Sequence, residues 1–113
     1  MTAFKGEIWL ANLNPVKRAN EVGKTRPVII FQNDDLNSSE YPTTIILPLT
    51  TSLIDNAGPL RFRVSKREKL LQNSDILVAQ IRAIDNSRLV KKVAKLENFE
   101  IKKVKELFDE ILE

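Results

Sequence analysis

The sequence contains neither cysteine nor histidine among its 113 residues. The absence of cysteine excludes disulfides, thiolate nucleophiles and cysteine-bound zinc or iron–sulfur sites, and it fits a reducing compartment. The absence of histidine excludes Ser-His and Cys-His dyads and any histidine-ligated metal. Chemistry in this chain must therefore use Arg, Lys, Thr, Ser, Asp, Glu or Tyr side chains.

Long apolar runs are also absent. No segment approaches the roughly 18 consecutive apolar residues that span a bilayer, and the first eight residues already include Lys5 and Glu7. The chain is therefore expected to be cytoplasmic, with no membrane partner. With 42% hydrophobic residues, three glycines and five prolines, its composition is that of a folded chain, and its length predicts one domain over residues 1–113.

Positive charge is concentrated in the middle of the chain. Residues 61–95 carry ten basic and three acidic side chains, whereas residues 1–60 carry five and six and residues 96–113 carry three and six. The net charge is only +3, so the distribution is more informative than the total. It indicates a surface that faces phosphate, although solvated positive faces are common.

Hydrophobic periodicity predicts several short strands followed by one helix. Strands are expected at 8–11, 27–32, 43–49, 60–64, 76–85 and 90–94, and an amphipathic helix at 99–112. Arg61 and Arg63 alternate with apolar residues, so one face of their strand is expected to be basic. The order predicts a mostly β fold, a small antiparallel barrel or curled sheet with a C-terminal helix packed on it. Four phenylalanines in apolar patterns are expected in the core: Phe31, Phe62, Phe99 and Phe108.

Five groups of residues occur in a specific order along the chain. They are Gly6-Glu7-Ile8-Trp9 with Leu13-Asn14-Pro15, Asn20-Glu21, Thr25-Arg26-Pro27-Val28 running into Gln32-Asn33-Asp34, Leu47-Pro48-Leu49-Thr50-Thr51-Ser52, and Gln80-Ile81-Arg82 with Ile84-Asp85 and Ser87-Arg88-Leu89. In this order and spacing they resemble the MazF/PemK family of toxin endoribonucleases, and the resemblance covers nearly the whole chain.

The resemblance implies a fold and a function. The fold is a small SH3-like barrel with helices, usually assembled as a homodimer. The activity is sequence-specific, metal-independent cleavage of single-stranded mRNA, with no cofactor, by the toxin of a toxin–antitoxin pair. The implied partners are single-stranded RNA and a cognate acidic antitoxin, with operator DNA bound only through the antitoxin complex.

RNA supplies its own nucleophile, the 2′-OH, so a ribonuclease needs to align that oxygen and stabilise charge on the phosphorane. Arg26 is expected to do the latter with paired guanidinium donors, and Thr50 matches the family's catalytic threonine. Glu21 is a candidate base or a carboxylate that orients Arg26. No metal ligands are expected. The candidates for substrate binding are Thr51, Ser52, Gln80, Arg82 and Arg61, of which Gln80 and Arg82 are expected to share one strand face.

Each candidate also has an ordinary structural interpretation. Arg26 is compatible with an exposed arginine at a strand entrance, Thr50 with a strand-terminating cluster, and Glu21 with a solvated loop position. Some family members carry an acidic residue before the glutamine of the later strand, but this chain has Ala79, so an acid–base role does not transfer there. Two other functions stay open, a DNA gyrase-directed toxin of related fold and a non-catalytic SH3-like module that binds nucleic acid or a peptide.

Overall fold

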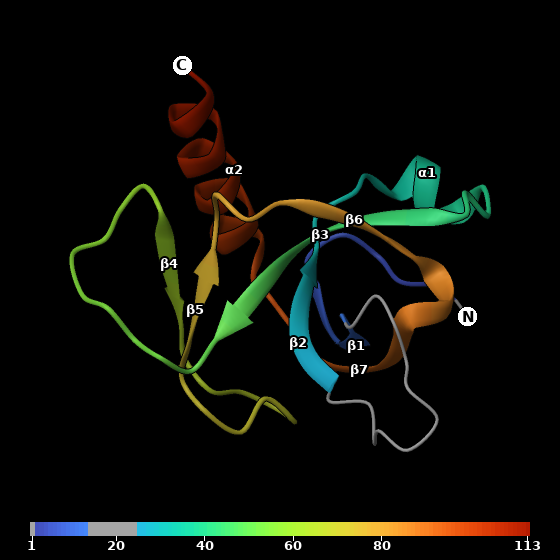
Figure 1. Ribbon diagram of the computed structural model, residues 1–113, viewed down its shortest axis with the longest axis horizontal. Helices are drawn as coiled ribbons and strands as arrows, with labels where there is room; N and C mark the ends of the chain where they lie inside the picture. The colour runs from blue at the N-terminus through green and yellow to red at the C-terminus, as the bar shows by residue number, and fades with distance from the viewer. Residues whose placement is uncertain (1, 14–24) are drawn as a thin grey trace.

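A computed structural model describes residues 2–13 and 25–113, and these form a curled antiparallel sheet with a helix against it (Figure 1). The elements in chain order are β1 (Glu7–Asn12), β2 (Thr25–Ile30), α1 (Asp34–Ser38), β3 (Thr43–Thr50), β4 (Arg61–Val64), β5 (Ser74–Leu77), β6 (Arg82–Asp85), the 3-10 turn η1 (Asn86–Arg88), β7 (Leu89–Lys95) and α2 (Asn98–Leu112). The strand order is β4-β5-β3-β2-β1-β7, with β6 paired to β3. The prediction of a mostly β fold with a C-terminal helix is confirmed.

Strand β3 connects the two parts of the sheet. One of its edges pairs with β2, for example Val28 with Pro48. The other edge pairs with β6 as far as Ile46 and with β5 from Leu49 onward. Pro48 lies between these two ladders, where β3 exchanges partners and a residue without an N–H is tolerated.

The expected continuous strand over 76–85 is wrong in its middle. Leu49 pairs with Ile76, whereas Ile46 pairs with Arg82, so six residues of this segment advance against three residues of β3. The excess is taken up by a turn between β5 and β6, in which the Gln80 N–H donates to the Leu77 carbonyl. Gln80 therefore lies in this turn and does not share a strand with Arg82.

The sheet buries apolar side chains on both of its faces, because residues alternate in direction along each strand. Ile8 pairs with Ile29 on one face, and Trp9 with Val28 on the other. The first face joins a cluster that includes Leu47, Ile76 and, from α2, Val104. The second face carries a smaller cluster, which includes Trp9, Val28, Ile30, Ile46 and Ile84.

Helix α2 packs its apolar side on the larger cluster. The rings of Phe31 and Phe108 meet edge to face at 5.5 Å, and Phe62 is partly buried against the same cluster. Phe99 is 72% exposed, so its expected core position is wrong. The reason is helical geometry, since at about 100° per residue Phe99 lies about 140° around the helix from buried Val104. Among the described residues, no helix is long and apolar enough to cross a membrane.

Candidate functional site

Arg26 and Thr50 lie just beyond the last paired residues of the β2–β3 ladder, Val28 and Pro48. Arg26 lies two residues before Val28 on β2 and pairs with Ala11 of β1, whereas Thr50 lies two residues after Pro48 on β3 and pairs with Asp75 of β5. Residues two apart on a strand share a face, so the Arg26 side chain projects from the face that carries Val28. Arg26 is exposed and Thr50 partly buried, and their sequence neighbours Pro27 and Thr51 line one groove.

Arg82 projects from the same face of the sheet, farther along β3. It pairs with Ile46, which lies four residues before Thr50 and points in the same direction. The separation along the strand is roughly 13 Å, from a rise of about 3.3 Å per residue. Exposed Gln80 lies in the turn that precedes β6. The structure thus places Arg26 and Thr50 at the same end of the β2–β3 pair and Arg82 farther along β3.

Three hydroxyl-bearing residues stand in a row where β3 ends, Thr50 in the strand and Thr51 and Ser52 in the loop that follows. The Thr50 Oγ1 accepts a hydrogen bond from the Ser52 N–H at 3.1 Å. This contact leaves the proton of the Thr50 hydroxyl available for donation to another oxygen. Thr51 and Ser52 are exposed beside it.

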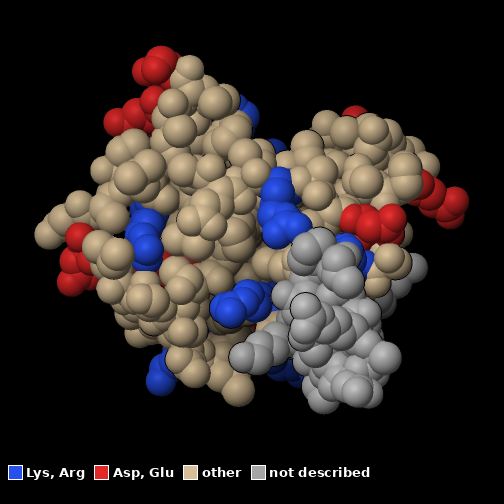
Figure 2. All heavy atoms as spheres, in the orientation of Figure 1, with Lys and Arg blue, Asp and Glu red and all other residues tan. Residues whose placement is uncertain are grey.

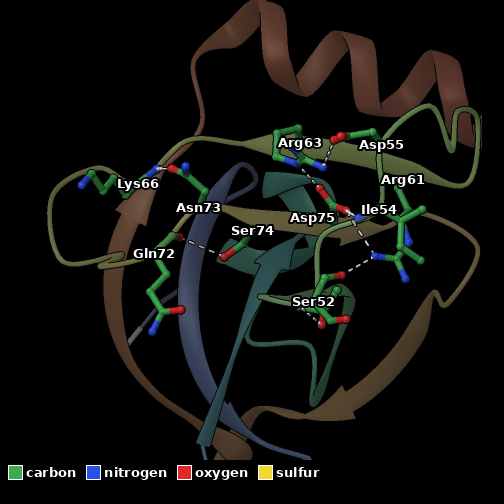
Figure 3. A network of polar contacts seen from close by, with 11 residues as sticks. Ser52, Ile54, Asp55, Arg61, Arg63, Lys66, Gln72, Asn73, Ser74 and Asp75 are labelled. Atoms are coloured by element: carbon green, nitrogen blue, oxygen red, sulfur yellow. Dashed lines mark hydrogen bonds and ion pairs between the residues drawn. The ribbon is translucent and has the colours of Figure 1, made fainter.

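A network of charged side chains lies behind this loop (Figure 3). Asp75 on β5 accepts from the guanidinium groups of Arg61 and Arg63, which project from β4. Burial acts to raise the pKa of the Asp75 carboxyl, but hydrogen bonds from Arg63, the Ile54 amide and Arg61 hold this pKa below its usual value. The basic face expected on 60–64 is therefore largely neutralised by carboxylates. Sequence reasoning missed Asp75, whose one signal was a charged residue at the start of an apolar run.

The charge on the surface around the site is uneven. Figure 2 shows basic side chains spaced across the middle of one face and acidic side chains toward its edges. A groove of about 470 Å³ opens beside the site and is lined by Pro27 and Thr51, the sequence neighbours of Arg26 and Thr50. Its walls also include exposed Leu71 and the lysines Lys69 and Lys91. An elongated partner with apolar and acidic groups is complementary to such a groove.

Glu21 lies outside the described residues. Within residues 2–13 and 25–113, no group of three or more aspartates and glutamates is arranged to hold a metal ion.

The chain was compared with known proteins. Residues 4–112 match the family described as PemK-like, MazF-like toxin of type II toxin-antitoxin system. The chain belongs to this toxin family. The resemblance carried by its sequence motifs is thereby confirmed.

Relatives of this family member agree in sequence and in fold. Endoribonuclease MazF of Staphylococcus saprophyticus is 37% identical over 107 residues, which cover 93% of this chain and 87% of that protein. The Mycobacterium tuberculosis toxin MazF-mt6 superposes with a TM-score of 0.76 at 18% identity, over 94% of this chain and 95% of that one. MazE-MazF of Deinococcus radiodurans, form II, gives a TM-score of 0.76 at 15% identity, over 99% and 96% of the two chains. The PemK-like, MazF-like fold therefore extends over the whole described sheet and α2.

Proposed function

We propose that this PemK-like, MazF-like toxin is an endoribonuclease that cleaves single-stranded mRNA at short sequences without a metal ion. The observation that carries the proposal is that Arg26 and Thr50 lie just beyond the end of the β2–β3 ladder and that their neighbours Pro27 and Thr51 line one groove. A guanidinium can donate to two phosphate oxygens at once, and a threonine hydroxyl can add a third donor. Such a set of donors matches the charge that develops on a phosphorane.

The reaction proceeds by attack of the RNA's own 2′-OH on the adjacent phosphorus. The 2′-OH loses its proton to a base, the new P–O bond closes a 2′,3′-cyclic phosphate, and the 5′-oxygen leaves with a proton as a 5′-OH. Arg26 stabilises the negative charge on the non-bridging oxygens by donating hydrogen bonds to them. Glu21 is the proposed base, or the carboxylate that orients Arg26.

Sequence selection is assigned to the neighbouring polar groups. RNA-binding proteins read unstacked bases in single strands by hydrogen bonding and stacking. We assign the reading of bases to Arg82 and Gln80 and to Thr51 and Ser52, all of which are exposed. Arg61 supports this binding surface through its hydrogen bond to the Ser52 carbonyl.

We further propose an acidic antitoxin, a homodimer and a cytoplasmic location. One solved relative is an endoribonuclease in complex with its cognate antitoxin from a mycobacterial species, with a TM-score of 0.72 at 14% identity, over 98% of this chain and 93% of that one. Operator DNA would be bound through the antitoxin complex.

The test is a cleavage assay on purified protein with single-stranded RNA and DNA of the same sequence, in EDTA. Cleavage of RNA alone, with cyclic phosphate and 5′-OH ends, is expected. A requirement for magnesium, or cutting of the DNA, would contradict the mechanism. Intact RNA together with inhibition of gyrase supercoiling would favour the gyrase-directed alternative, and intact RNA without gyrase inhibition would favour the non-catalytic module. Thr50→Ala, purified in parallel, controls for contaminating ribonuclease.

A further inference from the structure

A buried carboxylate stands behind the loop that follows Thr50. Asp75 is 1% exposed and pairs across the sheet with Thr50 on one side and with Arg63 on the other. Directly opposite residues of an antiparallel ladder point to the same face, so Asp75 lies beside Thr50 on the face that carries Arg26.

Both oxygens of this carboxylate are occupied. Oδ2 accepts from the Ile54 N–H at 3.0 Å and from Nη1 of Arg61 at 3.2 Å. Oδ1 accepts from Nε of Arg63 at 2.5 Å. Three donors hold this carboxylate, and it is closed off from solvent, so it serves as a fixed acceptor within the protein rather than as a base for the substrate.

The contacts continue from Asp75 through Arg61 to Ser52 (Figure 3), and from Ser52 to the Thr50 hydroxyl. Nη1 of Arg61, bound to Asp75, also donates to the Ser52 carbonyl at 2.8 Å. The N–H of the same Ser52 donates to the Thr50 Oγ1 at 3.1 Å. Residues 51–54 are thus tied at Ser52 and at Ile54 to one buried carboxylate, and the rotamer of Thr50 is tied to Ser52.

The charges of the network suit a role in holding the loop in place better than a role in binding a phosphate group. Arg63 bridges Asp75 and Asp55, so the two arginines are faced by two carboxylates. The Arg61 side chain is only 20% exposed. An arginine held and neutralised in this way keeps little charge for RNA, but it can fix the backbone on which Thr50 depends.

We propose that Asp75 is a positioning residue for RNA cleavage: acting through Arg61, it fixes loop 51–54 so that the Thr50 hydroxyl is presented to the scissile phosphate. This inference rests on the proposed endoribonuclease function. Misplacing a donor impairs the chemical step more than substrate binding, so loss of Asp75 is expected to lower kcat with little change in KM.

The first experiment compares Asp75→Asn with Asp55→Asn in single-turnover and steady-state RNA cleavage. Asp75→Asn keeps the shape and removes the charge, and we expect kcat to fall at least about tenfold with KM within about threefold. Asp55→Asn removes the other carboxylate on Arg63 and touches neither Arg61 nor Ser52, so both constants should stay within about twofold. Arg61→Gln should lower kcat as much as Asp75→Asn does. The double variant should lower kcat no further than either single variant, because both substitutions interrupt the same chain of hydrogen bonds.

The second experiment measures hydrogen exchange of the Ser52 and Ile54 amides by NMR, which needs no catalysis. We expect exchange at both amides to accelerate at least about tenfold in Asp75→Asn and to stay unchanged in Asp55→Asn. In Arg61→Gln, hydrogen exchange at the Ser52 amide should accelerate. If Asp75→Asn does not fold, the result for Arg61→Gln tests the proposal in its place.

The two hypotheses fail in different ways. Wild-type protein that leaves RNA intact would refute the proposed function, while the exchange data would still test the hold of Asp75 on the loop. Active wild-type protein, an inactive Thr50→Ala variant, and full kcat in both Asp75→Asn and Arg61→Gln would overturn the positioning role. Unchanged Ser52 exchange in Arg61→Gln would overturn it as well.

Discussion

Arg26 and Thr50 come from different strands, and each is expected to contribute a separate donor to one phosphate. Removing one transition-state donor typically costs about a hundredfold or more in rate. We therefore expect Arg26→Ala and Thr50→Ala each to lower RNA cleavage at least about a hundredfold. Arg26→Lys should recover only part of the loss, because an ammonium cannot make the paired contact of a guanidinium. Single-turnover rates on a short RNA oligonucleotide measure this.

Two exposed positions provide controls for these variants. Lys102→Ala removes a cation from the outer side of α2, and Ser38→Ala removes a hydroxyl from α1. Both should cleave at rates close to that of wild-type protein. Folded Arg26→Ala and Thr50→Ala variants with near wild-type rates would remove both residues from the site.

Individual site residues were predictable where a motif fixed them and unpredictable where folding assembled them. Arg26 and Thr50 each lie in a motif that resembles the family's, and this resemblance singled them out; their roles stay predictions. The role of Arg61 depends on Asp75, which is 14 residues away and joins it only through the β4–β5 ladder. The alternation of Arg61 and Arg63 therefore indicated a free basic face, because the pattern contained no information about the carboxylate opposite it.

The packing of α2 on the sheet depends on a glycine. Gly6 has φ +89°, and an added Cβ would lie 2.3 Å from Cδ1 of Ile101. Its backbone cannot shift easily, because its N–H donates to the Ile30 carbonyl and its carbonyl accepts from the Leu96 N–H, both at 2.8 Å. We expect Gly6→Ala to lower the free energy of unfolding by about 1–3 kcal/mol, as strain and overpacking combine.

Urea denaturation of a small set of variants tests this prediction. Adding Ile101→Val to Gly6→Ala removes the clashing Cδ1 but leaves the strained φ, so it should recover part of the loss. Gly58→Ala is the control, because an added Cβ there meets no atom within 4 Å. Equal stability of Gly6→Ala and wild-type protein would mean that this contact does not limit helix packing.

The first turn of α2 is fastened to the loop before β5 by an ion pair. Nη1 and Nη2 of Arg67 both donate to the carboxylate of Glu100, which is 6% exposed. The same carboxylate accepts from the Glu97 N–H and completes a capping box. Burial acts to raise the pKa of Glu100, but the bonds from Arg67 and from the Glu97 backbone hold it below the usual value.

A lowered folded-state pKa gives this pair a definite pH dependence. Its stabilisation is fully present above the unfolded pKa of about 4.3 and is lost as the pH falls through the lower folded value. At pH 7, Glu100→Gln is expected to cost about 1–3 kcal/mol of unfolding free energy, and this difference should shrink below about pH 4. Glu106→Gln, exposed on the same helix, is the control in urea titrations at each pH. A difference that does not change with pH would contradict the assignment.

The elements themselves were largely predictable, with two instructive errors. Each strand with clear alternation or a β-branched run was found, because local pattern and sheet position agree there. The segment over 76–85 looks continuous because both of its halves follow the same edge of β3. The segment is interrupted between β5 and β6 because six of its residues, from 76 to 82, span only three residues of β3, from 46 to 49. The local sequence does not encode this mismatch. Helix α1 was not predicted, because it is only five residues long and the bond from the Leu36 N–H to the Asn33 side chain that caps it is also typical of a turn.

The arrangement of charge over the whole molecule sets its partners. Ten of the 18 basic residues fall between 61 and 95, yet two of them are bound to Asp75 and one to Glu100. Lys92 is likewise paired, with Glu7. Exposed Arg82, which pairs with Ile46 across the sheet, is the basic group that we expect to face RNA. An acidic inhibitor that blocks the site must compete with RNA for the same groups.

Competition for Arg82 predicts how RNA and antitoxin respond to salt and to mutation. RNA affinity falls with salt in proportion to the number of phosphates contacted, so Arg82→Gln should reduce the slope of log K against log salt by about 0.7–1. Antitoxin affinity should weaken in the same variant, because carboxylates placed where phosphates bind are screened in the same way. Lys103→Gln on α2 should change neither affinity. Titrations of RNA and antitoxin at four salt concentrations measure both slopes, and a change in the RNA slope alone would show that the antitoxin binds elsewhere.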